Sequence, residues 1–475
     1  MVCWKLLPMP SLHPDPLESF RIGWPVARDD GLDDLARVIA EPGFRRHFRL
    51  PGGQFALCER DERTGIVAAL RDPTATMPLH AHYDGKRWLV CTSIRRIEAV
   101  VGRKFALKLE VLKKLHQTMR MDPAESLYHE VELLAPGVIY LLSSQGRIDK
   151  HPVPVEWPSP AAIMAMHRKS PEALVEEGLA IVQRSVVDAV GSSRAIVQQS
   201  GGLDSNLILH TAVRAGLPIA AHGMVFPGLD CDESSAMRKS CAIAGVAYDP
   251  VDYGGRAYEE WKQDLFRCAE YVPFMNSFML LSLGRKARDC GFQVTLDGIG
   301  GDEIFSWGLE RSISFLARSV GYRVLRASPT GLFYLSLRGV ARRALSGSEP
   351  SLRPYFTSGG WHFYMCGMQM LMDEGISTRS PCRDWRLIVS LLPLVAWTQL
   401  AARTRVRVFQ TLLLNGISRD LTTRAGLGKV FFDELGNKTM GTHPALGEPK
   451  FPYFGRLVPD FLSFSGAAGR PLEGI

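Results

Sequence analysis

One short segment constrains the fold more than any other: a strand, a glycine-rich loop and a helix follow one another directly. The strand is the apolar run Ala195–Gln199, and the helix is apolar at helical spacing over Asn206–Ala215. Between them lies SGGLDS, residues 200–205. Amide groups at the start of a helix carry partial positive charge, and adjacent glycines let the backbone come close to a phosphate. The segment therefore predicts a phosphate-binding loop in an α/β fold.

The side chains of this loop suit a ligand that carries both phosphate and a metal ion. Gly201 and Gly202 leave room for phosphate oxygens, and Ser200 and Ser205 add hydroxyl donors. The carboxylate of Asp204 would repel phosphate alone, but it suits a Mg²⁺ ion that bridges phosphate oxygens. The loop lacks the GxxxxGK[ST] pattern, which argues against P-loop phosphoryl transfer. The alternative is a glycine turn whose serine and aspartate only cap the helix.

The pattern of strands and helices changes once along the chain, at His151–Pro160, which has four prolines in ten residues. Before it, short β-rich runs alternate with turns, which favours an antiparallel domain. These runs are Gln54–Glu59, Gly65–Leu70, Trp88–Thr92 and Val138–Leu142. After it, strands alternate with helices, which predicts a parallel sheet flanked by helices. The further elements expected there are strands at Pro218–Phe226 and Phe292–Leu296, a helix at Glu233–Gly245, and mostly helix from Ile304 onward.

A second glycine-rich loop, LDGIGGDEIF, follows the later of these strands. Its acidic residues and glycines are Asp297, Gly298, Gly300, Gly301, Asp302 and Glu303. The glycines make a tight loop, and Asp302 and Glu303 open the next helix. Ligands of open α/β sheets bind at the carboxyl ends of the strands. An acidic group here is therefore expected to reach the same metal ion as Asp204.

These two loops resemble those of a known family. SGGLDS resembles the pyrophosphate-binding loop of the PP-loop ATPases, which cleave ATP between its α- and β-phosphates. The second loop resembles the SGEGSDE loop of the asparagine synthetases. In the same order, GISTRSPCRD at Gly375–Asp384 resembles that family's GLEARVPFLD, and RAGLGKVF at Arg424–Phe431 resembles its Arg- and Lys-bearing segment. Asp232 and Glu233 stand where the family has an acidic helix start.

The first half of the chain resembles the glutaminase domain of the same family, with departures. Gly52–Tyr83 is similar to the stretch in which RD precedes a turn, and Leu133–Leu141 to its PG hairpin. The resemblance thus covers most of residues 45–445. Glutaminase chemistry needs a processed N-terminal cysteine, whereas this chain begins Met1-Val2-Cys3. The glutamine-holding HRGPD and NGEIYN segments are also absent. The resemblance implies an inactive hydrolase, with Cys3 as a small buried hydrophobic residue.

The implied architecture is α/β with two domains. A β-rich, degenerate Ntn-type glutaminase-like domain is expected at 1–150 and a linker at 151–170. A PP-loop ATPase domain of the asparagine-synthetase type is expected at 171–475, with a parallel sheet, flanking helices and a helical C-terminal part.

A further departure bears on the nucleophile. The glutamate of SGEG, which asparagine synthetases place beside the attacking nitrogen, is Ile299 here. Isoleucine cannot accept a proton, whereas an α-amine is partly free base near pH 7. Lasso-peptide cyclases combine a degenerate glutaminase-like domain with a synthetase domain, and they join a peptide's N-terminal amine to an Asp or Glu side chain. The resemblance implies this activity, through an acyl-adenylate and with release of AMP and pyrophosphate.

The resemblance also implies roles for particular residues, with ATP and Mg²⁺ as cofactors. The catalytic residues would be Asp302, Lys429 and Arg424, and the metal ligands Asp204 and Asp302. The ATP- and pyrophosphate-binding residues would be Ser200, Gly201, Gly202, Asp204, Ser205, Asp297, Gly298, Gly300 and Gly301. Glu303, Arg379 and Asp384 would support the substrate domain. The alternative for Lys429 is a solvated lysine, and for Arg379 with Asp384 a structural ion pair.

Three other functions stay open. The first is a small-molecule carboxylate–amine ligase, such as a β-lactam synthetase or an ammonia-dependent asparagine synthetase. The second is a tRNA-modifying PP-loop enzyme, which the weak basic balance and the glutaminase-like half disfavour. The third is a non-enzymatic scaffold, which two intact acidic loops disfavour.

Composition limits partners and location. The net charge of +7 over 475 residues is too small to indicate nucleic acid, and the basic clusters Arg323–Arg343 and Arg403–Arg407 are interpreted as solvated helix faces. The longest apolar run, Leu387–Ala402, is too short to span a membrane and contains Pro393. Nine scattered cysteines without a CxxC pair fit a reducing cytoplasm. The expected partners are a precursor or core peptide, a leader-peptide protease and a leader-binding protein.

Overall fold

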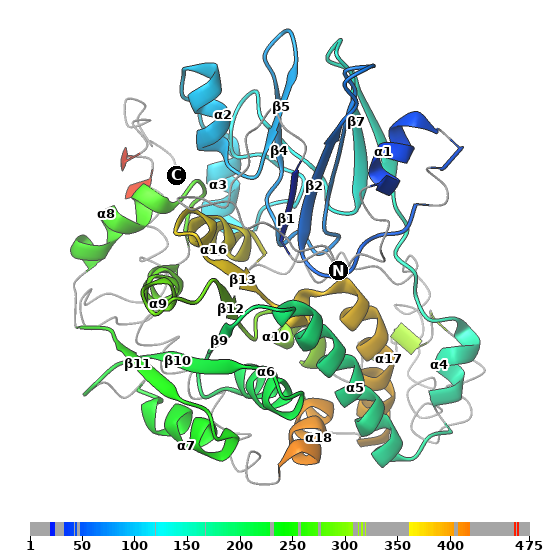
Figure 1. The fold of residues 1–475 in the computed structure, drawn as a ribbon, viewed down its shortest axis with the longest axis vertical. Coiled ribbons are helices and arrows are strands. Elements are labelled where there is room, and N and C mark those ends of the chain that lie inside the picture. Colours follow the sequence, from blue (N-terminus) through cyan, green and yellow to red (C-terminus); the bar gives the residue numbers. More distant parts are fainter. Residues whose placement is uncertain are drawn as a thin grey trace.

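The computed structural model describes most of the chain. The described residues are 20–23, 33–41, 43–44, 48–118, 120–166, 168–228, 232–254, 258–273, 277–306, 361–402 and 407–418, with the single positions 312, 315, 316, 319, 460, 461, 463 and 464. Figure 1 shows two β-sheet regions along the longest axis, with the N-terminal half in blue and cyan above and the later elements in green to orange below.

The N-terminal half is built from two antiparallel sheets. The five-stranded sheet has the order β1-β2-β3-β7-β8, and the three-stranded sheet has the order β5-β4-β6. Its strands are β1 (Phe20–Gly23), β2 (Phe55–Arg60), β3 (Val67–Arg71), β4 (His80–Tyr83), β5 (Trp88–Cys91), β6 (Glu132–Leu133), β7 (Val138–Leu142) and β8 (Ile148–Pro152). Its helices are α1 (Asp33–Ala40), α2 (Ile94–Val101) and α3 (Leu109–Thr118). The four predicted β-rich runs are confirmed, as is their antiparallel pairing.

The second half contains a five-stranded, all-parallel sheet of order β11-β10-β9-β12-β13. Its strands are β9 (Ala195–Gln198), β10 (Ile219–Val225), β11 (Tyr248–Asp252), β12 (Val294–Leu296) and β13 (Ser377–Arg379). The helices are α4 (Pro160–Met166), α5 (Pro171–Val190), α6 (Leu203–Arg214), α7 (Ser234–Ala244), α8 (Tyr258–Cys268), α9 (Ser277–Asp289), α10 (Gly301–Phe305), α16 (Trp361–Asp373), α17 (Trp385–Ala402) and α18 (Val408–Ile417), with a 3₁₀ turn, η2 (Pro381–Arg383).

Helices cover both faces of this sheet, with α6 and α7 on one side and α9 on the other (Figure 1). The central strand β9 is buried along its whole length, as the apolar sequence predicted. The α/β class, the parallel sheet, and the predicted helices at α6 and α7 are confirmed. The pattern missed β11 and β13. The predicted linker at 151–170 contains the end of β8 and all of α4. No helix in the described ranges is both long enough and apolar enough to cross a membrane.

A buried turn of the N-terminal half supports the later half. The carboxylate of Asp72 folds the turn by accepting bonds from backbone amides, among them that of Met77 at 2.9 Å. The hydroxyl of Thr74 donates to the carbonyl of Arg383 in η2 at 2.9 Å. In return, Nε of Arg383 donates to Thr76 Oγ1 at 2.8 Å. These groups are all buried, so the turn and η2 hold each other in one position.

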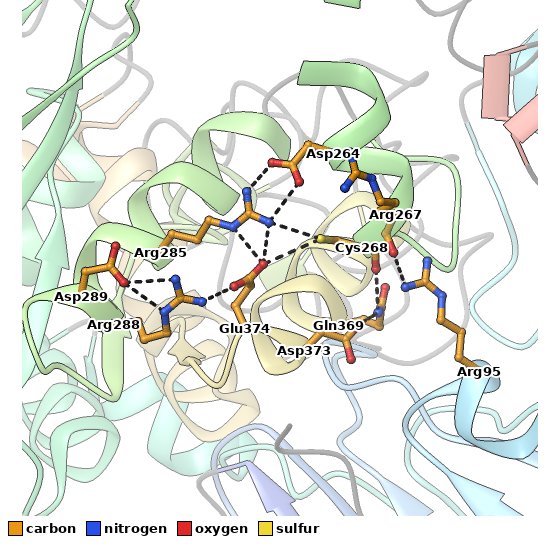
Figure 2. Close-up of polar contacts among 10 residues, drawn as sticks. All are labelled: Arg95, Asp264, Arg267, Cys268, Arg285, Arg288, Asp289, Gln369, Asp373 and Glu374. Atoms are coloured by element: carbon orange, nitrogen blue, oxygen red, sulfur yellow. Dashed lines mark hydrogen bonds and ion pairs between the residues drawn. The ribbon is translucent and has the colours of Figure 1, made fainter. Parts of the chain in front are cut away.

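A second polar network joins α8, α9 and α16 and reaches the N-terminal half (Figure 2). Arg285 donates to Glu374 at 2.7 Å and 2.9 Å and also bonds Asp264. Arg95, just inside α2, donates to the carbonyl of Ala269 at 2.7 Å. Charge-assisted bonds of this kind are stronger than neutral ones, so the network fixes α2 against the end of α8.

Candidate active site

The predicted phosphate loop joins β9 to α6 as expected. Gly201 has φ of +73°, which favours glycine, and Gly202 is the N-cap of α6 without a side-chain capping bond. The hydroxyl of Ser205 lies within 3.1 Å of the hydroxyl of Ser200 and within 3.2 Å of its amide nitrogen. Gln199, which the sequence did not single out, bonds Ser205 twice. The two serines therefore hold the shape of the loop around its glycines.

The second loop packs directly against the first. An added Cβ at Gly298 would meet the Asp204 carbonyl carbon, the Asp204 Cβ and the Ser205 amide nitrogen, each at 2.8 Å. An added Cβ at Gly301 would lie 2.2 Å from Asp204 Oδ1. Gly300 has φ of +97°, and α10 begins at Gly301, so Asp302 and Glu303 do open a helix. The two glycine loops therefore bring Asp204 and Asp302 to the same edge of the sheet.

Arg407 bridges the two carboxylates. Its guanidinium donates to Asp204 Oδ2 at 3.3 Å and forms an ion pair with Asp302. The amide of Gln410 donates to Asp204 Oδ1 at 2.5 Å. The Asp204 carboxylate thus contacts residues beside and within α18 rather than capping its own helix. Asp204 and Arg407 are each 21% exposed, whereas Asp302 is half exposed.

The interpretation of residues 403–407 as a solvated face is wrong for Arg407. Arg407 is the N-cap of α18 with φ of +65°, and its guanidinium points to the two acidic loops. Sequence spacing could not reveal this, because Arg407 lies more than 100 residues after the second loop. Residues 403–406 and the other cluster, at 323–343, lie outside the described residues.

The arrangement of charges fits a cation. Burial raises the pKa of Asp204, and the nearby Arg407 charge and the Gln410 bond oppose that rise. A positively charged group already lies between Asp204 and Asp302, which shows that the two carboxylates can share one cation. Mg²⁺ is commonly held by one or two carboxylates together with substrate phosphates. Within the described ranges no group of three or more His, Cys, Asp or Glu residues could hold a metal ion. The pair therefore suits an ion that a phosphate ligand helps to bind.

Asp297, which was predicted to bind ATP, is buried in the second loop. Its side chain is only 4% exposed, and Oδ1 accepts a bond from the Ile299 amide at 3.0 Å. Burial raises its pKa to about 6, while Ser380, the Ile299 amide and the charge of Arg383 act in the opposite direction. The carboxylate is therefore nearly enclosed in the structure.

The residues predicted to support the substrate domain have separate partners. Arg379 donates to the carbonyl of Ala189 at 2.6 Å, and burial lowers its pKa to about 10. Asp384 is 1% exposed and pairs with Arg386 at 2.6 Å. The expected alternative, an ion pair between Arg379 and Asp384, is therefore wrong, and Arg386 is the partner that the sequence did not indicate. Glu303 is half-buried beside the loop.

The remaining predicted residues divide into two groups. Glu233 lies beside the phosphate loop, since an added Cβ at Gly201 would be 3.3 Å from its Oε2. Asp232 accepts bonds from the amides of Phe226 and Ser234 and so fixes the start of α7. Cys3, Arg424 and Lys429 lie outside the described residues.

Comparison with known proteins supports the family resemblance of the central segment. Residues 189–348, about a third of the chain, match the family model described as asparagine synthase. This segment contains both glycine loops and both carboxylates. The segment is therefore similar to asparagine synthases. No curated protein matches the sequence.

Three solved structures show a weak likeness. A U34-tRNA thiolase, NcsA, from Methanococcus maripaludis has 11% identity and a TM-score of 0.25, over 64% of this chain and 84% of that one. A glutamine phosphoribosylpyrophosphate amidotransferase from B. subtilis has 10% identity and a TM-score of 0.14, over 57% and 46%. A glutamine-dependent NAD⁺ synthetase from Acinetobacter baumannii has 12% identity and a TM-score of 0.22, over 95% and 87%.

Proposed function

We propose that this protein is an ATP-dependent, AMP-forming amide ligase. The observation that carries the proposal is the meeting of two acidic glycine loops at one edge of the sheet, with Asp204 and Asp302 both paired with Arg407. The asparagine synthase match to residues 189–348 supports the reaction class.

The chain's own residues suggest how the first step would proceed. The loop amides and the hydroxyls of Ser200 and Ser205 would bind the pyrophosphate of ATP at the start of α6. Asp204 and Asp302 would hold Mg²⁺, which neutralises charge that builds on the phosphates. A substrate carboxylate then attacks the α-phosphorus, giving an acyl-adenylate and pyrophosphate. An amine attacks the adenylate carbonyl next, and AMP leaves as the amide forms. Lys429 and Arg424 stay predicted contributors to this charge stabilisation.

For the substrate we propose a peptide that the enzyme closes into a macrolactam, as a lasso-peptide cyclase does. The glutamine-holding HRGPD and NGEIYN segments are absent from residues 1–60, which argues against ammonia made from glutamine. Ile299 removes the glutamate that would serve the attacking nitrogen. Both features favour a nucleophile that is already an amine, such as a peptide N-terminus. The proposed partners are a leader-peptide protease and a leader-binding protein, in the cytoplasm, without nucleic acid.

The reaction class is tested with Asp204→Asn and Asp302→Asn. Each substitution removes one of the two charges that hold the metal and phosphates, so ATP-to-AMP turnover should fall by about 100-fold or more. Asp249→Asn, the same chemical change on the exposed edge strand β11, is the matched control. AMP and pyrophosphate release are measured together with circular dichroism. Near wild-type turnover in either folded variant would contradict the metal assignment.

The substrate is tested with leader-free candidate peptides that carry a free N-terminal amine and an internal Asp or Glu. When the amide bond closes the ring, the unmodified peptide should lose one water. Mass spectrometry should detect this as a decrease of about 18 Da. Replacing the acceptor carboxylate by its amide should abolish pyrophosphate release. Acetylating the N-terminus should leave adenylation possible but prevent ring closure. If aspartate with ammonium drives AMP formation and no peptide does, a small-molecule ligase replaces the cyclase.

A further inference from the structure

A small cavity lies behind the second glycine loop, between β13, α9, α16 and the N-terminal turn. The lining residues that matter here are Asp297, Ile299, Tyr364, Thr378 and Ser380. Asp297 lines it with a carboxylate that is 4% exposed. Oδ1 of Asp297 is bonded to the Ile299 amide, but Oδ2 is buried and has no hydrogen-bond partner of normal geometry. An unpaired buried carboxylate oxygen is costly, so its presence needs an explanation.

The cavity adjoins the place where the two acidic loops meet. Gly298, the residue after Asp297, packs on the backbone of Asp204. The pKa of Tyr364 is raised by burial and then by the negative charges of Glu303, Asp297 and Asp204. Tyr364, which lines the cavity, therefore lies within electrostatic reach of all three carboxylates.

We propose that Asp297 accepts the proton that the attacking amine releases when the amide bond forms. This inference rests on the proposed function. The amine nitrogen forms a bond to the adenylate carbonyl carbon, and the proton passes from nitrogen to Oδ2 of Asp297. The bond from that carbon to the phosphate oxygen then breaks, and AMP leaves with the electron pair. Asp297 would thus be the proton acceptor of this loop, a role that the side chain of Ile299, two residues later, cannot take.

The surroundings suit this role. A pKa of about 6 leaves Asp297 mostly ionised at pH 7.5 yet more basic than an ordinary aspartate, which is what a general base needs. Arg383 is the positive charge that acts on it. Burial raises the pKa of Tyr364 and of Cys382, so both stay neutral near pH 7, and the carboxylate of Glu303 lies near both.

The experiment separates the two chemical steps in the full-length protein. Asp297→Asn keeps the shape and removes the base, and Asp249→Asn is the matched exposed control. Three rates are compared with the leader-free precursor peptide: ATP–pyrophosphate exchange, trapping of the adenylate by hydroxylamine, and ring closure. Hydroxylamine also releases a proton when it attacks, but in excess it passes that proton to the solvent, so trapping does not depend on Asp297. In Asp297→Asn, exchange and trapping should stay within about 3-fold of wild type while ring closure falls about 100-fold or more.

A pH profile of wild-type ring closure gives an independent measurement. Below pH 7 a plot of the logarithm of the ring-closure rate against pH should have slope one, because the peptide amine must lose a proton to react. Below about pH 6 the slope should approach two, because Asp297 also takes up a proton there. Asp297→Asn should keep slope one throughout.

Three outcomes would overturn the role of Asp297. These are wild-type ring closure in Asp297→Asn, an equal loss of exchange and ring closure, and slope one down to pH 5 in the wild type. The third outcome is measured on the wild type alone, so it decides the question even if Asp297→Asn does not fold. If no peptide supports exchange by the wild type, the cyclase proposal fails instead. The same three rates with aspartate and ammonium then decide what Asp297 does.

Discussion

The contact between the two glycine loops can be tested by adding a single methyl group. In Gly298→Ala the new Cβ would lie 2.8 Å from three atoms of Asp204 and Ser205, two of which belong to the backbone. No φ in the left-handed region is involved, so the effect is steric. Backbone atoms cannot rotate away as a side-chain end can, and the loops must therefore separate by several tenths of an ångström.

The size of the effect follows from this geometry. Overpacking of a tight site typically costs about 1–3 kcal/mol, which for a chain of 475 residues that unfolds as one unit corresponds to a decrease in melting temperature of about 1–3 °C. The larger effect should be on chemistry, because Asp204 moves relative to Asp302. A misplacement approaching 1 Å can reduce a rate by about 100-fold.

Two measurements check this prediction: differential scanning calorimetry and pyrophosphate release under saturating Mg-ATP. Gly43→Ala is the matched control, because an added Cβ at Gly43 meets no atom within 4 Å. Gly43→Ala should keep both properties. If Gly298→Ala melts and turns over like the wild type, the close contact between the loops is refuted.

Two further predictions concern stability. Asp384→Asn removes the carboxylate that pairs with Arg386. Because Asp384 is 1% exposed, we expect the free energy of unfolding, measured with urea, to fall by about 2–4 kcal/mol. Glu41→Gln, in the exposed pair with Arg37, should change this free energy by less than about 0.5 kcal/mol. Burial lowers the pKa of His210 and of His222 to about 4, below the value in the unfolded chain. The contribution of the two neutral side chains to the free energy of unfolding is therefore complete above pH 6.5 and is lost as the pH falls toward 4. The urea midpoint should therefore drop between pH 7 and pH 5, His222→Gln should reduce that drop, and a flat wild-type profile would contradict the reasoning.

The sequence predicted the two glycine loops well, because a local pattern defines each of them. Both glycine loops join a buried strand to a helix. Each strand–loop–helix unit can be recognised from a short stretch of about fifteen residues. Parallel pairing of β9 with β12 then brings the two loops together without further information. This is why Asp204 and Asp302, almost 100 residues apart, were expected to meet before any contact was known.

Contacts that depend on long-range packing could not be predicted in this way. Arg407 belongs to a basic run whose composition is typical of an exposed helix, and only the packing of α18 against α6 and α10 brings it to the acidic loops. Arg386 has one partner two residues away, Asp384, and one on α5, Asp188, and only the second contact depends on long-range packing. The edge strands β11 and β13 are short and partly exposed, so their apolar pattern is weak.

Asp297 illustrates a conflict between stability and function at this site. A pKa of about 6 in the folded chain, against about 3.9 for an ordinary aspartate, means that the ionised group destabilises the fold at neutral pH by about 2–3 kcal/mol. That cost is absent below about pH 4, where folded and unfolded chains both hold the proton. Serine or asparagine could accept the Ile299 amide bond without this cost. The proton-accepting role proposed for Asp297 would give a reason for a carboxylate, with this cost, at the position.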